Sequence, residues 1–369
     1  MVVKIDSYDC YGRGVSRIDH KVCFVKGALV GEVVEIKIVE EKKSFLVAVV
    51  TRVLEKSLDR IEPLCPYYEK CGGCRFGMMS YSASLRAKEN TTLSLFEKNG
   101  FSCFSYLGIV PGQNYHYRNK IVLHSDGSSL GLYQEGSHDL VPIDACLLAD
   151  ARINQVIPTL SKDKDVMIRV SNVDDAMLIG ESKDVIISAI GSKKYRISAQ
   201  SFFQVNSEMC EKLYHYIYET VKMSSATTVL DLYCGIGTIG IYIHDLVREV
   251  LGIEIVKEAV RDAKYNQKLN HVSNISFLCG DVSKYASRLE KKYDFVIVDP
   301  PRAGLKEKVV EELIRIDAQT ILYVSCNPAT LIRDLKRFSD FYSLDSMKLF
   351  DMFPNTYHVE CVCVLKKRF

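Results

Sequence analysis

Residues 229–240 read VLDLYCGIGTIG, a short apolar strand that runs directly into a glycine-rich turn. Gly235, Gly237 and Gly240 match the G-x-G-x-x-G pattern, which lets a backbone turn tightly and approach an adenosine cofactor closely. Glu254 ends the next apolar run, at the distance expected for an acid that accepts the two ribose hydroxyl protons. The stretch therefore predicts an α/β sheet with a cofactor at the carboxyl ends of its strands.

Strand and helix patterns alternate from about residue 201 to the end of the chain. Apolar runs of strand length recur at 229–232, 250–253, 275–278, 295–298, 321–324 and 359–365. Alternation at this spacing is typical of a doubly wound sheet with right-handed crossovers. We expect residues 200–369 to form a Rossmann-like α/β domain.

Two smaller segments precede this domain. Residues 1–58 contain β-branched runs between glycine or charged turns, which predicts a compact OB-like barrel or a plain β-appendage. Residues 59–199 combine a helix over 81–98 with hairpin signals and short strands, which predicts an α+β segment. The chain of 369 residues is thus expected to be multidomain.

Composition narrows the class of protein. Apolar residues make up 47% of the chain, and neither an 18-residue apolar run nor a signal peptide is present, so we expect a cytoplasmic protein without a membrane span. A net charge of +2 argues against a strongly basic, non-specific nucleic-acid binder. Local basic patches are still allowed: Tyr115, Tyr117, Arg118 and Lys120 form an aromatic–basic run that is equally consistent with an ordinary strand face.

Acidic residues at three successive strand ends help to distinguish an S-adenosylmethionine site from a dinucleotide site. Glu254, Asp281 and Asp299 occupy these ends, and Asp299 begins the run DPPR. The two prolines remove two backbone donors and stiffen the turn, which frees the Asp299 carboxylate to face a ligand. A nicotinamide or flavin enzyme does not need this set, so the pattern favours S-adenosylmethionine over the dinucleotide alternative; a rigid loop that only ends a strand is the structural alternative.

A cysteine and a glutamate near the carboxyl terminus carry the predicted chemistry. Residues 325–329 (SCNPA) place Cys326 directly after an apolar strand, and a following helix is expected to lower the pKa of its thiol. Glu360 enters an otherwise apolar strand, where a carboxylate is costly unless it faces a cleft. Methylation of uracil C5 requires a thiolate that adds to C6 and a base that removes the C5 proton. The alternatives are an inert core cysteine, a solvated strand end, and His358 as the base.

A cluster of cysteines lies near the start of the second segment. Cys65, Cys71 and Cys74 fall within ten residues, and two glycines between the last two let the backbone wrap closely around a ligand. Cys146 is the best candidate for a fourth ligand and Cys103 the second. The spacing differs from the paired C-x-x-C ligands of zinc ribbons and indicates a [4Fe–4S] cluster, with a zinc site as the alternative.

Taken together, these motifs resemble the bacterial RNA uracil-5-methyltransferases that carry a TRAM domain and a [4Fe–4S] cluster. The motifs are GALVGE at 27–32, CGGC at 71–74, SFFQVN at 201–206, DLYCG at 231–235, DPPR at 299–302, SCNP at 325–328 and HVE at 358–360. The resemblance implies a TRAM-type barrel, a class I methyltransferase domain, an S-adenosylmethionine cofactor and an RNA substrate, with Cys326 as nucleophile and Glu360 as base. It implies that the cofactor pocket is lined by Gln204, Tyr233, Gly235, Glu254, Asp281 and Asp299, and that the cluster is held by Cys65, Cys71, Cys74 and Cys146.

The resemblance points to 23S ribosomal RNA as the substrate of a monomeric enzyme, with transfer RNA as the alternative. Two departures from the family stand out: Thr238 replaces an asparagine common in relatives, and the middle region is shorter than in larger members. A base-amino RNA methyltransferase, which needs no thiol, is a second hypothesis. An iron–sulfur RNA-binding protein without catalysis is the third.

Overall fold

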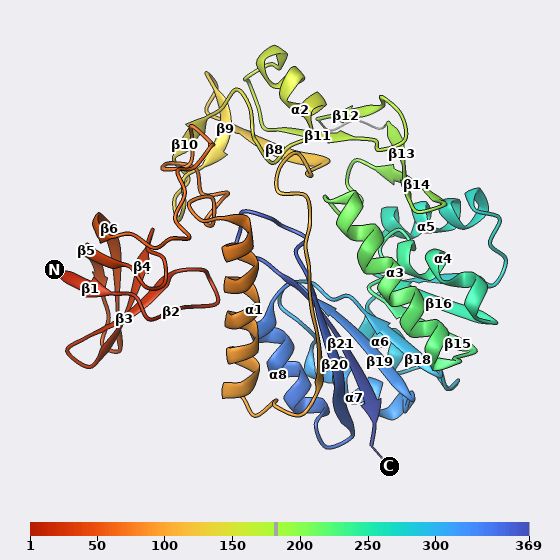
Figure 1. Ribbon diagram of the computed structural model, residues 1–369. Helices are drawn as coiled ribbons and strands as arrows, with labels where there is room; N and C mark the ends of the chain where they lie inside the picture. The colour runs from red at the N-terminus through yellow and green to blue at the C-terminus, as the bar shows by residue number, and fades with distance from the viewer. Residues whose placement is uncertain (181–183, 369) are drawn as a thin grey trace.

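The computed structural model describes residues 1–180 and 184–368, whose strands form four sheets (Figure 1). The first sheet has the order β1-β5-β6-β4-β3-β2 and comprises β1 (Val2–Lys4), β2 (Ser7–Tyr8), β3 (Gly14–Ile18), β4 (Lys21–Lys26), β5 (Val33–Glu41) and β6 (Phe45–Glu55). Residues alternate between buried and more exposed at Cys23 in β4 and Val34 in β5, as in strands with one face on a core. The β-branched runs of residues 1–58 thus form strands, as predicted.

The middle of the chain supplies a long helix, an antiparallel sheet and a hairpin. Its elements are α1 (Tyr81–Lys98), β7 (Ser105–Val110), β8 (Lys120–Ser125), β9 (Leu130–Tyr133), β10 (Leu140–Pro142), α2 (Ala151–Val156), β11 (Val166–Val170), β12 (Met177–Ile179), β13 (Val185–Ile190) and β14 (Lys193–Ser198). The sheet has the order β10-β9-β8-β11-β12, and β13 pairs with β14. Helix α1 begins after Ser80, whose hydroxyl accepts a hydrogen bond from the Ala83 N–H, and it ends at the predicted stop, Asn99 and Gly100.

The last sheet has the strand order β17-β16-β15-β18-β19-β21-β20-β7. Its remaining elements are α3 (Ser207–Ser224), β15 (Thr228–Leu232), α4 (Thr238–Tyr242), β16 (Glu249–Glu254), α5 (Lys257–Leu269), β17 (Ile275–Cys279), α6 (Val282–Ala286), β18 (Phe295–Val298), α7 (Glu307–Ile316), β19 (Thr320–Ser325), α8 (Pro328–Phe338), β20 (Tyr342–Phe350) and β21 (Glu360–Lys367). Strands β15 to β19 are parallel, whereas β21 lies antiparallel between β19 and β20. A dinucleotide-binding sheet has the order 3-2-1-4-5-6 and no such insertion, which argues against the nicotinamide or flavin alternative.

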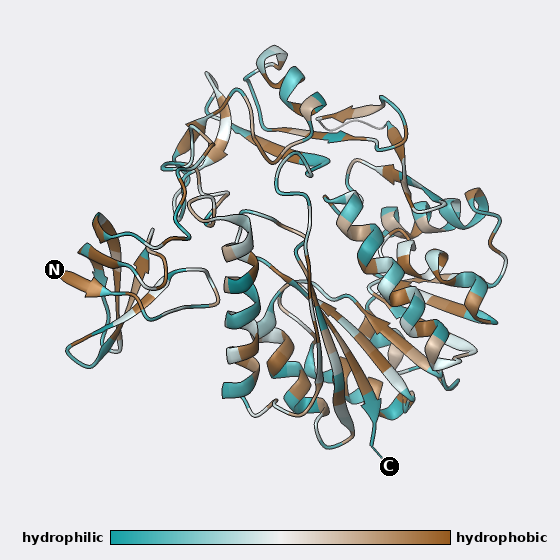
Figure 2. Cartoon of the chain, viewed as in Figure 1, coloured by the Kyte–Doolittle hydropathy of each residue, from teal (hydrophilic) through white to brown (hydrophobic). Residues whose placement is uncertain are grey.

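Helix α1 and strand β7 belong to this last sheet in space, although both lie within residues 59–199 in sequence. Strand β7 pairs in parallel with β20, and Phe96 of α1 is fully buried in the same core as the sheet residues Leu230 and Tyr323. In Figure 1, α1 stands beside α8 and faces the N-terminal sheet, and Figure 2 shows apolar strands between more polar helices. The sequence-based division at residues 199 and 200 therefore does not follow the sheets.

The helices also bear on whether the chain could span a membrane. None of the helices in the described residues is both long and apolar enough to cross a bilayer.

Candidate active site and cysteine cavity

The glycine-rich loop after β15 is held open by its backbone and by one carboxylate. Gly235 and Gly237 have φ values of +54° and +80°, which residues other than glycine rarely adopt. A Cβ atom on Gly237 would lie 2.6 Å from the ring of Phe277, so no larger residue fits there. The Gly235 N–H donates a hydrogen bond of 3.1 Å to Oε2 of Glu254, which ties the loop to the end of β16.

The predicted site residues lie around one cavity of about 910 Å³, which is in the size range of small-ligand sites. The structure brings all eight of them together: Gln204, Tyr233, Gly235, Glu254, Asp281, Asp299, Cys326 and Glu360. We call this the catalytic cavity. Thr238 does not line it, and its hydroxyl instead lies 2.7 Å from the Tyr214 hydroxyl.

Several residues of the catalytic cavity were not predicted from the sequence. Ile255 and Val256 follow Glu254 and are 58% and 45% exposed, and Phe202 is 67% exposed beside Gln204. Apolar side chains left open at a cavity mark a surface that a flat ligand can cover. The sequence did carry a signal, because Ile255 and Val256 directly follow the predicted ribose-binding acid.

Buried carboxyl groups dominate the electrostatics of this region. Burial raises the pKa of Asp299 to about 7 and that of Asp231 to about 8, and it also raises the pKa of Glu360 well above its usual value. Asp231 lies beneath the loop, where Oδ2 accepts from the Gly240 N–H at 3.1 Å and Oδ1 has no partner. A buried group of acids that repel one another is complementary to a cationic ligand such as a sulfonium.

Asp281 shows the opposite behaviour at the neighbouring strand end. Its side chain caps α6 and accepts hydrogen bonds from the backbone N–H and hydroxyl of Ser283. These bonds, together with Lys306 at 3.3 Å, lower the pKa of Asp281 below its usual value. Asp281 is therefore ionised at neutral pH, whereas burial shifts the pKa of Asp299 and that of Glu360 in the opposite direction.

Cys326 lies between β19 and α8, where the sequence placed it. The side chain of Asn327 caps α8 by accepting from the Ala329 N–H at 3.1 Å. The expected lowering of the thiol pKa is wrong for the free protein: burial, and after it the carboxyls of Glu360 and Asp299, raise the pKa of Cys326 to about 11. The helix terminus and the Arg302 guanidinium do not offset these effects, so Cys326 is a neutral thiol before ligands bind.

His358 lines the same cavity, and its ring packs against Tyr357 with centroids 4.1 Å apart. Burial, and after it the nearby cations Arg302 and Lys88, together lower the pKa of His358 to about 4. The imidazole is therefore neutral at pH 7. Because Glu360 is only 6% exposed and enters the cavity from the first residue of β21, it keeps its place as the primary candidate for the base.

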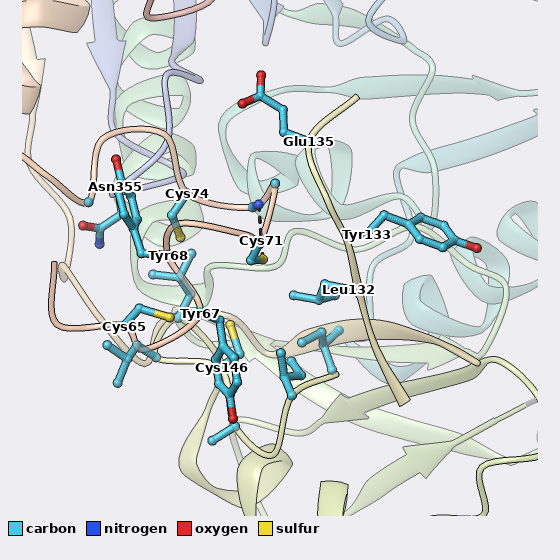
Figure 3. Close-up of a pocket in the computed structure, with 18 of the residues that line it drawn as sticks. Cys65, Tyr67, Tyr68, Cys71, Cys74, Leu132, Tyr133, Glu135, Cys146 and Asn355 are labelled. Atoms are coloured by element: carbon cyan, nitrogen blue, oxygen red, sulfur yellow. Dashed lines mark hydrogen bonds between the residues drawn. The ribbon is translucent and has the colours of Figure 1, made fainter. Parts of the chain in front are cut away.

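Four of the chain's cysteines line a second cavity, of about 470 Å³ (Figure 3), which we call the cysteine cavity. They are the four predicted ligands, Cys65, Cys71, Cys74 and Cys146, whose sulfurs point into a shared space in Figure 3. Cys103, the second choice for the fourth ligand, is exposed and lies outside this cavity. Gly72 allows the close wrapping predicted from the sequence, since a Cβ there would lie 2.9 Å from the Glu135 backbone.

The described residues do not show the cysteine cavity as a formed metal site. Within residues 1–180 and 184–368, no group of three or more His, Cys, Asp or Glu side chains is arranged to hold one metal ion. The thiols nevertheless influence one another: burial and the neighbouring Cys146, Cys71 and Cys65 raise the pKa of Cys74 to about 12.

The aromatic–basic run of residues 115–120 is not an open surface. Tyr117 is 7% exposed and its hydroxyl donates to the Pro354 carbonyl at 3.0 Å, while Tyr115 faces the cysteine cavity. Arg118 lines both cavities, and so do Gly72 and Gly73. The two cavities therefore share a wall.

Comparison with known proteins places this geometry in a family. A family model described as tRNA (Uracil-5-)-methyltransferase matches residues 163–368, and a TRAM domain model matches residues 2–51. An uncharacterized RNA methyltransferase of Caldanaerobacter subterraneus subsp. tengcongensis is 32% identical, with 100% of this chain and 98% of that protein aligned. Another, from Staphylococcus aureus strain COL, is 30% identical over 96% of this chain and 95% of its own length.

One solved structure matches the whole chain. The Pyrococcus abyssi tRNA (uracil-54, C5)-methyltransferase, crystallised with S-adenosyl-L-homocysteine, has a TM-score of 0.78 at 25% sequence identity, covering 99% of this chain and 100% of that one. The expected TRAM domain and class I methyltransferase fold are thereby confirmed. The family model covers more than half of the chain, and the chain belongs to the tRNA (uracil-5-)-methyltransferase family.

Proposed function

We propose that the protein transfers a methyl group from S-adenosylmethionine to C5 of a uridine in RNA. One observation carries the proposal: Cys326 and Glu360 face the same cavity as the glycine-rich loop and the buried acids Asp299 and Glu254. A nucleophile and a base in one cavity are what C5 methylation requires, and base-amino methylation would leave the thiol without a task. The acidic lining suits a positively charged methyl donor.

In this proposal Cys326 and Glu360 act in turn on the same uracil. The sulfur of Cys326 forms a bond to C6, and the electron pair of the C5–C6 double bond moves into an enolate with nucleophilic character at C5. S-adenosylmethionine would supply the methyl group that C5 takes up, and would leave as S-adenosylhomocysteine. Glu360 then accepts the C5 proton, the double bond re-forms, and the bond between C6 and sulfur breaks. The uridine must be flipped out of its stack to reach the sulfur.

Both groups need help to reach their reactive forms. The pKa of the Cys326 thiol and that of Glu360 are raised in the free protein, chiefly by burial and then by neighbouring acids. A cation bound in the catalytic cavity lowers the pKa of every nearby carboxyl and thiol. Cofactor binding is thus expected to precede formation of the covalent adduct.

We propose 23S ribosomal RNA as the substrate, with transfer RNA as the second candidate. The combination of a TRAM domain with the cysteine set supports ribosomal RNA. The second candidate is favoured by the Pyrococcus abyssi relative, which acts on uracil 54 of transfer RNA and shares the fold over the full chain.

We further propose that Cys65, Cys71, Cys74 and Cys146 hold a [4Fe–4S] cluster with a structural role. The cluster would fix the loop of residues 65–74, which contains turns and an isolated bridge but no helix or strand. Anaerobically purified protein should contain iron and acid-labile sulfide, and Cys146→Ser should lose both. The matched control Cys103→Ser, outside the cavity, should keep them; zinc in place of iron would overturn this part of the proposal.

Three predictions about the whole chain stand with this proposal. The division into residues 1–58, 59–199 and 200–369 serves as a functional one, with RNA contacts in the first two parts. All thirteen cysteines are free, in keeping with a reducing compartment such as the cytoplasm. A monomer is expected.

The test is to incubate anaerobically purified protein with labelled S-adenosylmethionine and separate pools of unmodified 23S ribosomal RNA and transfer RNA. Label in 5-methyluridine from one pool would support the reaction and identify the substrate. Label in a methylated adenine or cytosine would overturn the Cys326 chemistry. No label in either pool, from protein with an intact cluster, would favour an iron–sulfur RNA-binding protein.

A further inference from the structure

A row of alternating rings and guanidinium groups connects the N-terminal sheet to the catalytic segment. Its members, which we call the aromatic track, are Phe24, Arg13, Tyr11, Tyr357 and Arg75. The Arg13 guanidinium carbon lies 4.3 Å from the ring centroid of Phe24 and 5.5 Å from that of Tyr11. The rings of Tyr11 and Tyr357 are 6.0 Å apart, and the Arg75 guanidinium lies 4.9 Å over Tyr357.

The inner end of the track reaches the catalytic cavity. Arg302 donates a hydrogen bond of 3.2 Å to the Tyr357 hydroxyl, and the next residue, His358, lines the catalytic cavity with Cys326. A small space of about 30 Å³ is bounded by Cys326 on one side and by Tyr11 and its neighbours in the β2–β3 turn on the other. The N-terminal sheet therefore contributes a turn to the immediate surroundings of the nucleophile.

This contact is built into the fold at Gly12. Gly12 has a φ of +73°, and a Cβ atom there would lie 2.5 Å from the Phe76 ring and 2.9 Å from Cβ of Tyr357. Arg75 secures the same turn, because its guanidinium donates to the Tyr11 carbonyl and to the carboxylate of Glu135. The turn is thus held against the catalytic segment from two directions.

Tyr11 is nevertheless left open. Tyr11 is 48% exposed although the other members of the track lie around it. Its ring contacts the Tyr357 ring edge-on, with an angle of 70° between the two ring planes. A tyrosine that only filled a gap between domains would be buried. Positive charge is in excess around it, since two carboxylates, Asp9 and Glu135, face four cations, Arg13, Lys26, Arg75 and Arg302. An open ring in a cationic surface suits a nucleobase with its phosphate.

We propose that the aromatic track binds the unpaired nucleotides beside the target uridine, with one base stacked on Tyr11. This inference rests on the proposed function and adds the form of the substrate: single-stranded RNA at this point of the surface. Flipping of a uridine unstacks its neighbours, and unpaired bases are recognised by stacking on aromatic rings and arginine planes. Bases inside a duplex stay stacked on each other and cannot cover the Tyr11 ring.

The chain contains no tryptophan, which allows a direct test of stacking. Tyr11→Trp places the only tryptophan of the variant in the track, where it can be excited selectively over the tyrosines, and an oligouridylate of about ten nucleotides should quench its emission in a saturable way. Tyr265→Trp is the matched control: Tyr265 is 45% exposed, lies beneath the Arg196 guanidinium at 4.9 Å, and lines neither cavity. Its emission should change little, and a duplex RNA of equal length should quench neither variant.

Removal of the ring should weaken RNA binding without affecting the cofactor. Tyr11→Ala is expected to bind the oligouridylate about tenfold more weakly, whereas Tyr11→Phe, which keeps the ring, should bind like the parent. With full-length substrate RNA, Tyr11→Ala should raise KM about tenfold and leave kcat and S-adenosylmethionine affinity unchanged. Thermal melting of each variant checks that the N-terminal sheet is folded.

The experiments distinguish failure of RNA stacking on the aromatic track from failure of the proposed methyl transfer. Equal quenching in Tyr11→Trp and Tyr265→Trp, or unchanged RNA binding by Tyr11→Ala, would overturn the track while 5-methyluridine formation still supported the proposed function. Saturable quenching of Tyr11→Trp without any 5-methyluridine product would overturn the proposed function and leave an RNA-binding track in place. If Tyr11→Ala is unfolded, the Tyr11→Phe and Tyr11→Trp measurements decide.

Discussion

The catalytic cavity and the cysteine cavity share a wall but are built in opposite ways. The catalytic cavity takes its polar groups from strand ends: Glu254 ends β16, Asp299 follows β18, and Cys326 follows β19. The cysteine cavity takes its thiols from loops, in which Cys65 and Cys146 belong to no helix or strand. Backbone hydrogen bonds between strands hold the first set in place, whereas the second set has no comparable scaffold.

The difference indicates a division of labour. Groups on a rigid sheet can keep unfavourable protonation states, because the sheet bears the cost of their burial. Thiols on loops depend on a bound group to hold them together. We therefore expect substitutions in the catalytic cavity to affect chemistry more than stability, and substitutions in the cysteine cavity to do the reverse.

Cys326→Ala should have the largest effect. Loss of the nucleophile is expected to lower turnover by about 10⁴-fold or more and to abolish the denaturation-resistant adduct with RNA containing 5-fluorouridine. The melting temperature should stay within a few degrees of the parent. Turnover near the parental level in Cys326→Ala would contradict both the mechanism and the contrast between the cavities; Cys103→Ala is the control.

Glu360→Gln should come next, with turnover reduced about 10²- to 10⁴-fold. The amide keeps the shape of the side chain but cannot accept the C5 proton, so the methylated adduct should accumulate on Cys326. Denaturing gel electrophoresis with labelled RNA detects this species. An adduct that fails to accumulate while turnover is lost would assign proton removal to another group, and His358→Gln tests the neighbouring candidate.

A buried ion pair beside the shared wall gives the third prediction. Lys88 of α1 and Asp351 are both fully buried, 2.5 Å apart, and Lys88 also donates to the Phe353 carbonyl at 3.0 Å. The segment that follows, residues 353–360, lines the catalytic cavity and contributes Asn355 to the cysteine cavity. Lys88→Met leaves a buried carboxylate unpaired and should cost about 3–5 kcal/mol of unfolding free energy.

The double variant Lys88→Met with Asp351→Asn separates the pair from its surroundings. It should recover part of the lost stability, since no unpaired charge remains. Denaturant unfolding measures both variants. A single variant as stable as the parent would show that the ion pair does not anchor the segment between the two cavities.

The catalytic cavity was predictable from the sequence because carboxyl ends of parallel strands meet at one edge of a sheet. All eight predicted residues line one cavity for this reason. The neighbours of β21 were less predictable: β20 was missed, and β7 joins the sheet from the middle of the chain. The contact between Tyr11 and Tyr357 depends on tertiary packing alone and leaves no local pattern.

The thiol pKa shows a different limit of sequence reasoning. The helix after Cys326 was found where expected, but its effect on the pKa was outweighed by burial and by two acids that are distant in sequence. Local geometry can be anticipated from spacing, whereas the sum of opposing electrostatic effects depends on which groups the fold brings together. The four cysteines illustrate the same point, since their choice was predictable and their mutual arrangement was not.

The smallest predicted effect is a dependence of cofactor affinity on pH. The pKa of Asp299 is raised to about 7, so in the free protein this carboxyl loses its proton as the pH rises through neutrality. A cationic ligand binds the ionised form better, and S-adenosylmethionine affinity should therefore increase with pH, by up to about fivefold between pH 6 and pH 7. Asp299→Asn should flatten the profile measured by calorimetry.

The same carboxyl links pH to stability with the opposite sign. Because the folded-state pKa of Asp299 lies above its unfolded value, its contribution to stability is fully present below about pH 4 and is lost as the pH rises toward 7. The free enzyme should thus lose stability over the range in which its affinity for the cofactor increases. If S-adenosylmethionine affinity does not change with pH in the parent, or changes equally in Asp299→Asn, then Asp299 is not one of the groups that bind the cation. Either result would also weaken the claim that the sheet holds a carboxyl group in an unfavourable protonation state until the ligand binds.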